Sequence, residues 1–571
     1  MVWAIDNMLN IKYSDILKLN KQFEKNLTTN SYKITILSNI IVHQVKEIFE
    51  YYLRSNLINA SIQLGDYDNV VQDSQKFNKS DSVIIFWELC NLIDGLYYKI
   101  ELLTDKELNA IYEKTRSEIN LVFKNLEKSS LVLINRFTSF TFTESNVENN
   151  NFDKLAIRLN HFLENNLPSN IRLINLEKII SSIGINKSLD MRYFYSSKSL
   201  YTIEFFKAYA KYVYPYFMSA NGKTKKALIF DCDNTLWKGV LGEDGFDNIE
   251  MSTASKDGSI FAEIQSIAIS MNKQGILLGL CSKNNQDDIN EVIRSHPDMQ
   301  LRDKYITVNK SNWFDKVSNL KEISKELNIG LDSVVFIDDS SFEVNLVKES
   351  LPEVTVLQVP KNLYNYPKLL RECMGLFFNL SKADEDRKKI NMYKHQVIRE
   401  EVKKNFINID DYLTSLGLIV TILINKKNVV SRIAQMSQKT NQFNLTTKRY
   451  TQADITNLMN DPKFDIYAFS VDDKFGDSGI TGLCIIKYNN KIHSAKIDTL
   501  LMSCRIIGRN IEYAFFDYLV DELKKKKVNT VKAKYAKTIK NEQVKEFYEK
   551  CSFAITKSSG SIKNYILKTN N

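Results

Sequence analysis

Short apolar runs alternate with longer amphipathic segments along the first 220 residues. Four of these runs have the length of a strand, and they cover residues 33–37, 60–64, 82–87 and 131–136. Between them apolar positions recur at helical spacing, as in residues 42–57 and 105–127. Strands that alternate with helices form parallel sheets covered on both faces, so this pattern predicts a small doubly wound α/β domain.

Three further apolar runs, in the middle of the chain, each end in polar residues. They cover residues 227–230, 276–280 and 333–337, with helical patterns between them. A fully apolar run of this length is typical of a strand buried on both faces of a parallel sheet. The carboxyl ends of such strands meet at one edge of the sheet, where open α/β sheets bind ligands. We therefore expect Asp231, Ser282 and Asp338 to lie close together.

A separate α/β unit is predicted from about residue 381 to the end. Its strands are expected at residues 419–424, 465–471, 482–488, 494–501 and 530–535, with a helix over 510–523. The predicted domains are 1–220, 221–380 and 381–571, and the fold class is multidomain α/β with a central parallel sheet. Residues 194–217 carry aromatic side chains at helical spacing, which predicts a packing seam between domains.

Length and charge change this picture little. The chain of 571 residues is too long for a single core. Its 77 basic and 68 acidic residues give a net charge of +9, which over this length is weak evidence for nucleic acid, so no nucleic-acid partner is predicted. A signal-peptide pattern and a run of about 18 uncharged apolar residues are both missing. We expect a cytoplasmic protein with no membrane partner.

The cysteines and histidines indicate no structural metal or disulfide framework. The seven cysteines are scattered with no C-x-x-C pair, at Cys90, Cys232, Cys281, Cys373, Cys484, Cys504 and Cys551. Free thiols in a reducing cytosol are the simpler interpretation. None of the five histidines lies in a ligand pattern, and His296, before Pro297, is expected to be structural.

The polar residues at the three strand ends suit phosphoryl or acyl-phosphate chemistry. Such chemistry needs a nucleophile, an acid or base for the leaving oxygen, and cations that spread the developing charge. Asp231 can attack phosphorus and Asp233 can protonate the leaving group. Asp338 or Asp339 can complete an oxygen-rich Mg²⁺ site. The Ser282 hydroxyl and the Lys316 ammonium can hold phosphate oxygens.

Asp231-x-Asp233-x-Thr235, Ser282, Lys316 and Asp338-Asp339 together resemble the four motifs of the haloacid dehalogenase (HAD) superfamily. Longer strings resemble the FkbH-like subfamily, HAD class IIIC, and they cover residues 231–245, 280–285, 435–446 and 503–509. The resemblance spans roughly residues 194 to 553. It implies catalytic roles for Asp231, Asp233, Ser282 and Lys316 and a metal site of Asp231, Asp233 and Asp338. Expected substrate-binding residues are Asn234, Thr235, Asn284 and Asp339.

FkbH-like proteins take the glyceryl group of 1,3-bisphosphoglycerate and load it onto the phosphopantetheine thiol of an acyl carrier protein, with a cysteine as acyl relay. For that relay we prefer Cys281, because Lys283 and a bound metal would favour its thiolate. Cys232 is the rival, although its side chain is expected to point into the sheet packing. A buried inert thiol is the alternative for both.

Two segments depart from the FkbH-like pattern. Asp338-Asp339-Ser340-Ser341-Phe342-Glu343 replaces the usual Asp-Asp-Asn-Pro-x-Glu, and Lys238 replaces the commoner glycine after Trp237. The segment between the first two motifs is too short for a large cap domain. A site with so little cover could admit a tethered substrate.

The N-terminal domain has a slight resemblance to hydrolases of the SGNH type. Ser38 follows the first predicted strand, where those enzymes hold their nucleophile, and Gly65 follows the second. Their remaining motifs are missing, so we favour a non-catalytic domain that docks or scaffolds, with Ser38 as a helix N-cap.

The C-terminal domain resembles the GNAT acyltransferase fold. Arg505-x-x-Gly508-x-Asn510 before a helix would place backbone N–H groups at the pyrophosphate of coenzyme A. Asn510 replaces the usual Gly or Ala, so a phosphopantetheine arm, or nothing, is the alternative ligand. The predicted acyl- or pantetheine-binding residues are Lys439, Asn441, Asn444, Arg505, Gly508, Arg509 and Asn510. The cationic run 524–527 is expected to be solvated at a helix end.

These features predict an Mg²⁺-dependent HAD-type enzyme that acts on a phosphorylated small molecule. It would dephosphorylate the substrate through Asp231 and pass an acyl group through Cys281 to a carrier-protein thiol. One alternative is a phosphatase or phosphotransferase acting on a sugar phosphate. Another is a carrier-protein-binding assembly module with vestigial catalysis.

Overall fold

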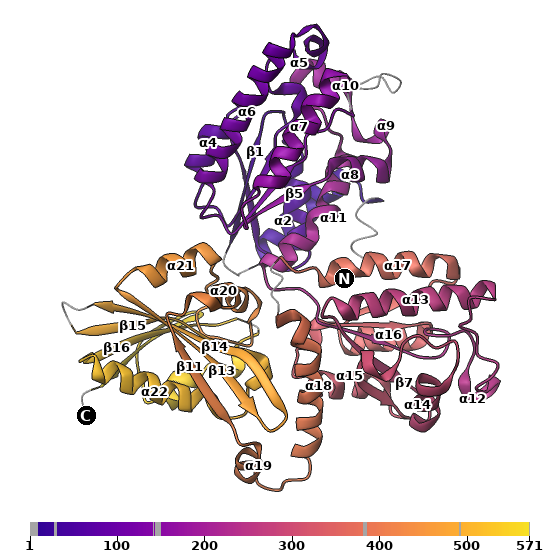
Figure 1. Ribbon diagram of the computed structural model, residues 1–571, viewed down its shortest axis with the longest axis vertical. Helices are drawn as coiled ribbons and strands as arrows, with labels where there is room; N and C mark the ends of the chain where they lie inside the picture. Colours follow the sequence, from indigo (N-terminus) through magenta and orange to yellow (C-terminus); the bar gives the residue numbers. More distant parts are fainter. Residues whose placement is uncertain are drawn as a thin grey trace. The chain divides into compact units, whose positions relative to one another are not determined.

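The computed structural model describes residues 10–27, 31–140, 142, 150–380, 385–489, 493–538 and 540–569. It divides into two compact units, Met1–Asn221 and Gly222–Asn571 (Figure 1). The second unit holds both the sheet expected to carry the active site and the C-terminal sheet. Among the described residues, no helix combines the length and the apolar character needed to cross a membrane.

The first unit is built on a parallel sheet with the strand order β2-β1-β3-β4-β5. The strands are β1 (Tyr32–Ser38), β2 (Ala60–Leu64), β3 (Ser82–Phe86), β4 (Leu131–Asn135) and β5 (Ile171–Ile174). The helices form two packed groups, α2 (Tyr13–Asn26), α3 (Val45–Arg54), α8 (Leu176–Ile183) and α11 (Ile203–Ala220) in one, and α4 (Val70–Lys76), α6 (Asp105–Asn125) and α7 (Asn151–Asn166) in the other. The predicted α/β class is confirmed, and β5 is a strand that the sequence analysis missed.

Helix α11 carries the predicted aromatic pattern, but it packs inside the first unit. The ring of Tyr209 lies 4.7 Å from that of Phe86 on β3, and the ring of Phe217 lies 5.6 Å from that of Phe49 on α3. Both α11 residues are buried. These aromatic side chains therefore belong to the core of the first unit, and the expectation of a seam between domains was wrong for them.

The first sheet of the second unit is parallel, with the order β10-β9-β6-β7-β8. Its strands are β6 (Ala227–Phe230), β7 (Leu277–Ser282), β8 (Ile306–Ser311), β9 (Val334–Asp338) and β10 (Thr355–Gln358). The connecting helices are α13 (Lys256–Lys273), α14 (Gln286–Ser295), α15 (Lys316–Glu326) and α16 (Ser341–Ser350), with α17 (Tyr366–Cys373) after β10. In the middle of the sheet, Phe230 of β6 is in register with Leu280 and Ile337. The next residue of each strand, Asp231, Cys281 and Asp338, therefore reaches the same edge.

The second sheet has the order β11-β13-β14-β15-β16-β18-β17, with the short strand β12 paired to β15. Its strands are β11 (Ile419–Ile424), β12 (Phe443–Asn444), β13 (Phe464–Asp473), β14 (Gly476–Asn489), β15 (Ser494–Met502), β16 (Thr530–Ala536), β17 (Ala554–Ser559) and β18 (Ile562–Lys568). Helices α20 (Val430–Lys439), α21 (Gln452–Asn460) and α22 (Ile511–Lys525) accompany the sheet, and α18 (Glu385–Lys403) precedes it.

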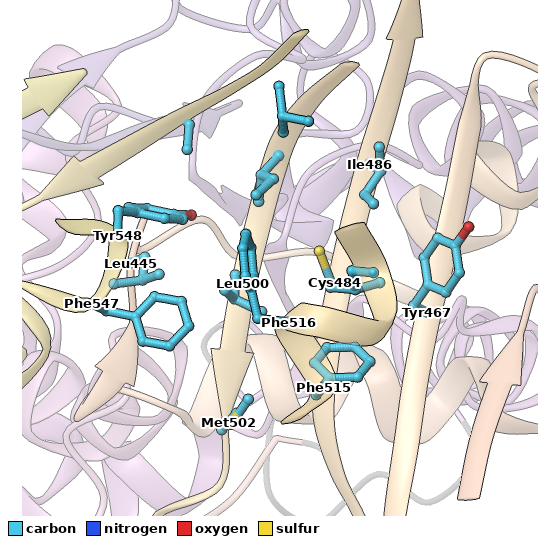
Figure 2. Close-up of a cluster of buried hydrophobic side chains, with 14 of the residues drawn as sticks. Leu445, Tyr467, Cys484, Ile486, Leu500, Met502, Phe515, Phe516, Phe547 and Tyr548 are labelled. Carbon is cyan, nitrogen blue, oxygen red and sulfur yellow. The ribbon is translucent and has the colours of Figure 1, made fainter. Parts of the chain in front are cut away.

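An apolar core joins α22 to this second sheet. Phe515 and Phe516 of α22 pack over Cys484 and Leu500 of the central strands (Figure 2). The ring of Phe515 lies 4.4 Å from that of Phe469 on β13. Burial of this many apolar side chains makes the C-terminal sheet and α22 one packed body.

Candidate active site

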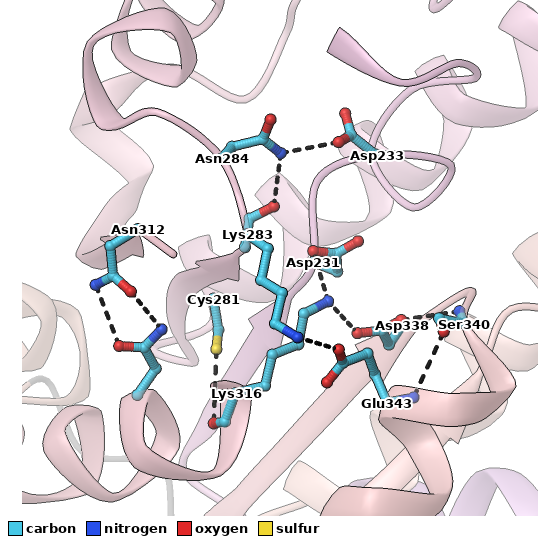
Figure 3. A network of polar contacts seen from close by, with 12 residues as sticks. Asp231, Asp233, Cys281, Lys283, Asn284, Asn312, Lys316, Asp338, Ser340 and Glu343 are labelled. Carbon is cyan, nitrogen blue, oxygen red and sulfur yellow. Dashed lines mark hydrogen bonds and ion pairs between the residues drawn. The ribbon is translucent and has the colours of Figure 1, made fainter. Parts of the chain in front are cut away.

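The candidate active site lies where β6, β7 and β9 end. Asp231, Ser282 and Asp338 are all buried there, with 5%, 1% and 0% of their surfaces exposed. The sequence analysis expected these three residues to meet, and the strand register explains why they do. Figure 3 shows the polar network that surrounds them.

Lys316 joins the two strand-end carboxylates. It is the first residue of α15, a helix that Asp315 caps by accepting a hydrogen bond from the Ser318 amide. Its Nζ lies 2.9 Å from Oδ1 of Asp231 and 2.5 Å from Oδ2 of Asp338. Burial disfavours the charged ammonium, but the carboxylates of Asp231 and Asp338 outweigh this effect and raise the pKa of Lys316. The site therefore keeps a buried cation next to the predicted nucleophile.

Burial raises the pKa of Asp231 to about 7, and the neighbouring Asp338 carboxylate contributes in the same direction. Lys316 and the hydroxyl of Ser282 act in the opposite direction, because they interact with the ionised form. A nucleophile must be ionised to attack. Additional positive charge at this position would therefore favour the reactive state.

Three carboxylates form a group that can hold a cation. Asp231, Asp338 and Asp339 each offer an oxygen, and these oxygens lie within 4.8 Å of one another. Burial, followed by the Asp338 carboxylate, raises the pKa of Asp339. Carboxylate oxygens are ligands that suit Mg²⁺, and a divalent cation would relieve the repulsion among them.

Asp233 lies outside this carboxylate group. Its Oδ1 accepts hydrogen bonds from the Trp237 indole (3.1 Å) and the Leu241 amide (3.0 Å), and its Oδ2 accepts one from Asn284 (2.8 Å). The structure therefore places Asp339 in the carboxylate group where the sequence analysis had placed the Asp233 side chain. The Asp233 carboxylate instead faces the loop after β6, a position that suits proton transfer to a leaving oxygen.

The other predicted substrate-binding residues shape the surrounding loops. Asn284 donates from Nδ2 to the Ser282 hydroxyl (3.0 Å) as well as to Asp233, so it links the first two motifs. Asn234 has a φ of 51° and accepts a hydrogen bond from the Gly239 amide at 3.0 Å. Thr235 is fully buried, and its carbonyl accepts a hydrogen bond from the Tyr366 hydroxyl. These contacts give Asn234 and Thr235 structural roles in the turn after β6.

The structure contradicts the expectation that Cys281 carries a favoured thiolate. Its side chain is fully buried among apolar residues such as Ile229 and Phe336, and the thiol donates only to the Lys316 carbonyl, at 3.9 Å. Burial raises the pKa of the Cys281 thiol, and nearby carboxylates add to the shift while Lys316 opposes it. Side chains alternate along a strand, so the residue next to Ser282 faces the core.

Cys232 is equally buried. Burial, followed by the Asp231 carboxylate, raises the pKa of its thiol, although a hydrogen bond with the Ser282 hydroxyl acts against this. The thiol is therefore held protonated, and its orientation into the sheet packing stays a prediction.

Lys283, expected to support a thiolate, pairs instead with Glu343. Its Nζ lies 2.6 Å from Oε1 of Glu343, in the first turn of α16 (Figure 3). The pair ties the loop after β7 to the first turn of α16. Glu343 is the last residue of the string 338–343, and nothing in the sequence indicated that it would pair with Lys283.

Of the predicted pantetheine-binding residues, Asn441 contacts the segment before β6 and the others lie in loops and elements of the C-terminal sheet. Asn441 donates to the Gly222 carbonyl at 2.9 Å, and Asn444 is buried with its Oδ1 accepting hydrogen bonds from the Thr446 and Thr447 amides. Arg505 and Arg509 are also buried. Gly508 and Asn510 adopt positive φ values of 83° and 58° in the loop before α22, and Lys439 ends α20.

In the first unit, Ser38 does not cap a helix. Its hydroxyl donates to the Ile40 carbonyl (2.6 Å) and accepts from the Ile40 amide (3.0 Å), whereas α3 begins only at Val45. The sequence analysis did not single out Glu88, a buried acid that follows β3. It is 2% exposed, and burial raises its pKa to about 7. A glutamate that follows an apolar strand by two residues gave no distinct sequence signal.

No family model matches the chain, and no curated protein sequence matches it. Among solved structures, it is similar to the N-terminal part of protein BF1531 from Bacteroides fragilis, which contains a phosphatase domain and was crystallised with Mg. The two share 25% identity and a TM-score of 0.56, over 65% of this chain and all of that one.

Smaller matches concern N-acetyltransferases. The ribosomal-protein-S18-alanine N-acetyltransferase of Escherichia coli is 13% identical over 26% of this chain and 91% of its own, with a TM-score of 0.21. Spermidine/spermine N-acetyltransferase SpeG of Vibrio cholerae is 15% identical over 28% and 95%, with the same TM-score. The similarity to BF1531 supports the HAD-type phosphatase fold of the predicted resemblance, and the FkbH-like subfamily stays a prediction.

Proposed function

We propose that this chain is an Mg²⁺-dependent phosphatase of the HAD type. The observation that carries the proposal is the contact of Lys316 with both Asp231 and Asp338 at the carboxyl edge of a parallel sheet. The similarity to the Mg-bound phosphatase domain of BF1531 supports the choice of metal. Asp231, Asp338 and Asp339 would hold the ion, which would neutralise phosphate charge during transfer.

The proposed reaction has two steps. A carboxylate oxygen of Asp231 attacks phosphorus, the bond from phosphorus to the leaving oxygen breaks, and Asp233 donates a proton to that oxygen. In the second step Asp233 accepts a proton from water, which attacks the phosphoryl group on Asp231. Inorganic phosphate leaves and both aspartates return to their starting state. Lys316 and Ser282 stabilise the charge on the phosphoryl oxygens.

By the FkbH-like resemblance, we extend the proposal to glyceryl transfer from 1,3-bisphosphoglycerate to an acyl carrier protein. The carrier's phosphopantetheine thiol would attack the acyl carbonyl, the bond from that carbon to the phosphate oxygen would break, and phosphate would leave with the thiol proton. Asp231 would then remove the remaining phosphate ester. Because Cys281 and Cys232 are buried with raised thiol pKa values, we propose direct attack by the carrier thiol with neither cysteine as relay.

Phosphate release and intact mass test the proposal together. Purified protein is incubated with Mg²⁺ and 1,3-bisphosphoglycerate, with and without a carrier protein that bears phosphopantetheine. Without the carrier, we expect phosphate release that Asp231→Asn abolishes and that Asp288→Asn, a matched change on the exposed face of α14, leaves intact. A glyceryl adduct on the carrier supports transfer, and phosphate release without it restricts the function to a phosphatase. Tight carrier binding with no phosphate release would instead support an assembly module.

A further inference from the structure

The C-terminal sheet contains a gap between two neighbouring strands. β15 and β16 are parallel, and they pair only at Ser494↔Thr530, Ala495↔Val531 and Lys496↔Lys532. β15 continues to Met502 and β16 to Ala536, so their later residues turn unpaired edges toward each other. An extended ligand with amide groups, such as the pantetheine arm of coenzyme A, would fit such a gap by pairing with the strand edges.

The chain itself fills this gap. Phe443 and Asn444 of β12 pair with Met502 and Leu501, and the Leu445 amide donates to the Leu500 carbonyl at 3.1 Å. On the other side, the Ala536 amide at the end of β16 donates to the Leu445 carbonyl at 2.8 Å. The segment 443–445 therefore bonds to both strands, as a bound arm would.

Burial shows that this segment belongs to the core. Phe443, Asn444 and Leu445 are 2%, 1% and 0% exposed. Leu445 lies among Leu500, Phe547 and Tyr548 (Figure 2). Asn541, which is fully buried, also donates from Nδ2 to the Asn444 carbonyl at 2.9 Å. Removing the segment would expose apolar surface and leave buried polar groups unpaired, so it does not act as a mobile lid.

The arginines of the predicted pyrophosphate site already contact other residues of the chain. Arg509 donates to Gln396 (2.8 Å) and pairs with the fully buried carboxylate of Asp473 (3.2 Å), and Arg505 contacts Met392 of α18. Glu512, in the first turn of α22, is 9% exposed and its Oε2 has no hydrogen-bond partner within the described part of the chain. A carboxylate at this helix N-terminus would repel a phosphate anion bound there.

The same loops contact the phosphatase sheet where its central strands begin. Asn441 donates to the Gly222 carbonyl, and Asn328 donates to the Cys504 carbonyl. Lys226, directly before β6, places its Nζ 3.9 Å from the Cys504 sulfur. Lys540 pairs with Asp332, two residues before β9. β6 and β9 are the strands that carry Asp231 and Asp338 at their other ends.

We infer that the C-terminal domain is an intrachain clamp on the phosphatase sheet and that it does not bind coenzyme A. The groove that the gap between β15 and β16 would form is filled by β12. Arg505 and Arg509 contact α18 and Asp473. The remaining loop contacts reach the residues before β6 and β9. The residues present therefore do not fit the cofactor that the GNAT resemblance suggested. Any acyl transfer by this chain would take place elsewhere than in this groove.

Titration of the full chain tests the closed groove without reference to phosphatase activity. Coenzyme A and acetyl-coenzyme A are titrated at millimolar concentration by calorimetry. We expect no saturable heat. Saturable binding that is lost in Gly508→Asp would overturn the inference.

Hydrogen exchange of the full chain tests the clamp. In Lys226→Met and Asn441→Ala, we expect the amides of β6 and β9 to exchange roughly tenfold faster or more, because local opening becomes less costly. Lys525→Met, a matched change of an exposed lysine on α22, is expected to leave these rates unchanged. Unchanged exchange in β6 and β9 of both clamp variants would overturn the clamp. These results stand whether or not the chain proves to be a phosphatase.

Discussion

The ammonium nitrogen of Lys316, the first residue of α15, lies 2.9 Å from Oδ1 of Asp231, which directly follows β6. The contact is buried at both ends, with 5% of the Lys316 side chain and 7% of the Asp231 side chain exposed. A cation held this close to a buried carboxylate stabilises its ionised form, which is the form a nucleophile needs. The first prediction, in which Asp231 becomes phosphorylated, depends on this arrangement.

Replacing Asp233 with Asn is expected to separate the two chemical steps. Loss of a general acid and base lowers turnover by about 10²–10⁴-fold. A substrate with a good leaving group, such as p-nitrophenyl phosphate, still phosphorylates Asp231, because its leaving oxygen needs little protonation. Intact mass should therefore show the enzyme with one added phosphoryl group. The Asp231→Asn, Asp233→Asn double variant is the control, and an adduct that persists in it would place the nucleophile elsewhere.

Replacing Asp338 with Asn is expected to weaken activation by Mg²⁺. The change removes a charged oxygen from the group formed with Asp231 and Asp339. The Mg²⁺ concentration needed for half-maximal phosphatase activity should rise by on the order of 10- to 100-fold. A chelator should abolish wild-type activity, and added Mg²⁺ should restore it. An unchanged Mg²⁺ requirement in the variant would argue against a metal site at these carboxylates.

Replacing Cys281 with Ala tests whether its burial excludes a role as relay. We expect phosphate release to survive, while the free energy of unfolding falls by about 1–2 kcal/mol because a small buried side chain is lost. Iodoacetamide should not modify Cys281 in the native protein and should modify it after denaturation. A glyceryl thioester on the enzyme that disappears in this variant would show that the buried thiol does become accessible.

Replacing Glu88 with Gln should stabilise the first unit at alkaline pH. Burial raises the folded-state pKa of Glu88 from 4.5 to about 7. The folded state therefore binds its proton more tightly, and stability falls as the pH rises between these two values. Above pH 7 the wild-type protein carries a buried ionised carboxylate, at a cost of about 3 kcal/mol.

Denaturant unfolding at several pH values, followed by tryptophan fluorescence, measures this effect. The difference in the free energy of unfolding between Glu88→Gln and the wild type should be largest near pH 8. It should vanish near pH 4, where Glu88 is protonated in both the folded and the unfolded state. Glu113→Gln, a change at an exposed position of α6, is the control. A difference between Glu88→Gln and wild type that does not depend on pH would show that Glu88 titrates normally.

The sequence by itself determined which strands form the edge of the candidate active site and which residues end them. Ala227–Phe230 and residues 334–337 are uninterrupted apolar runs, each followed by an acid, and a parallel sheet brings such strand ends to one edge. Local pattern was enough here because the strands are buried on both faces. Strands β5, β8 and β10 mix polar with apolar residues, lack this contrast with their surroundings and were missed.

Only the tertiary structure decided how the side chains at that edge are used. Strand alternation places the Cys281 side chain in the apolar core. The first turn of α16 brings Glu343 into an ion pair with Lys283. Hydrogen bonds from Trp237, Leu241 and Asn284 hold the Asp233 carboxylate outside the carboxylate group. Asp339 belongs to that group instead. Likewise, Asn444 was predicted to bind an acyl or pantetheine group, yet it lies in the segment 443–445, which closes a gap between two strands. Such outcomes depend on contacts between residues far apart in sequence, where burial and pairing set the chemistry of each group.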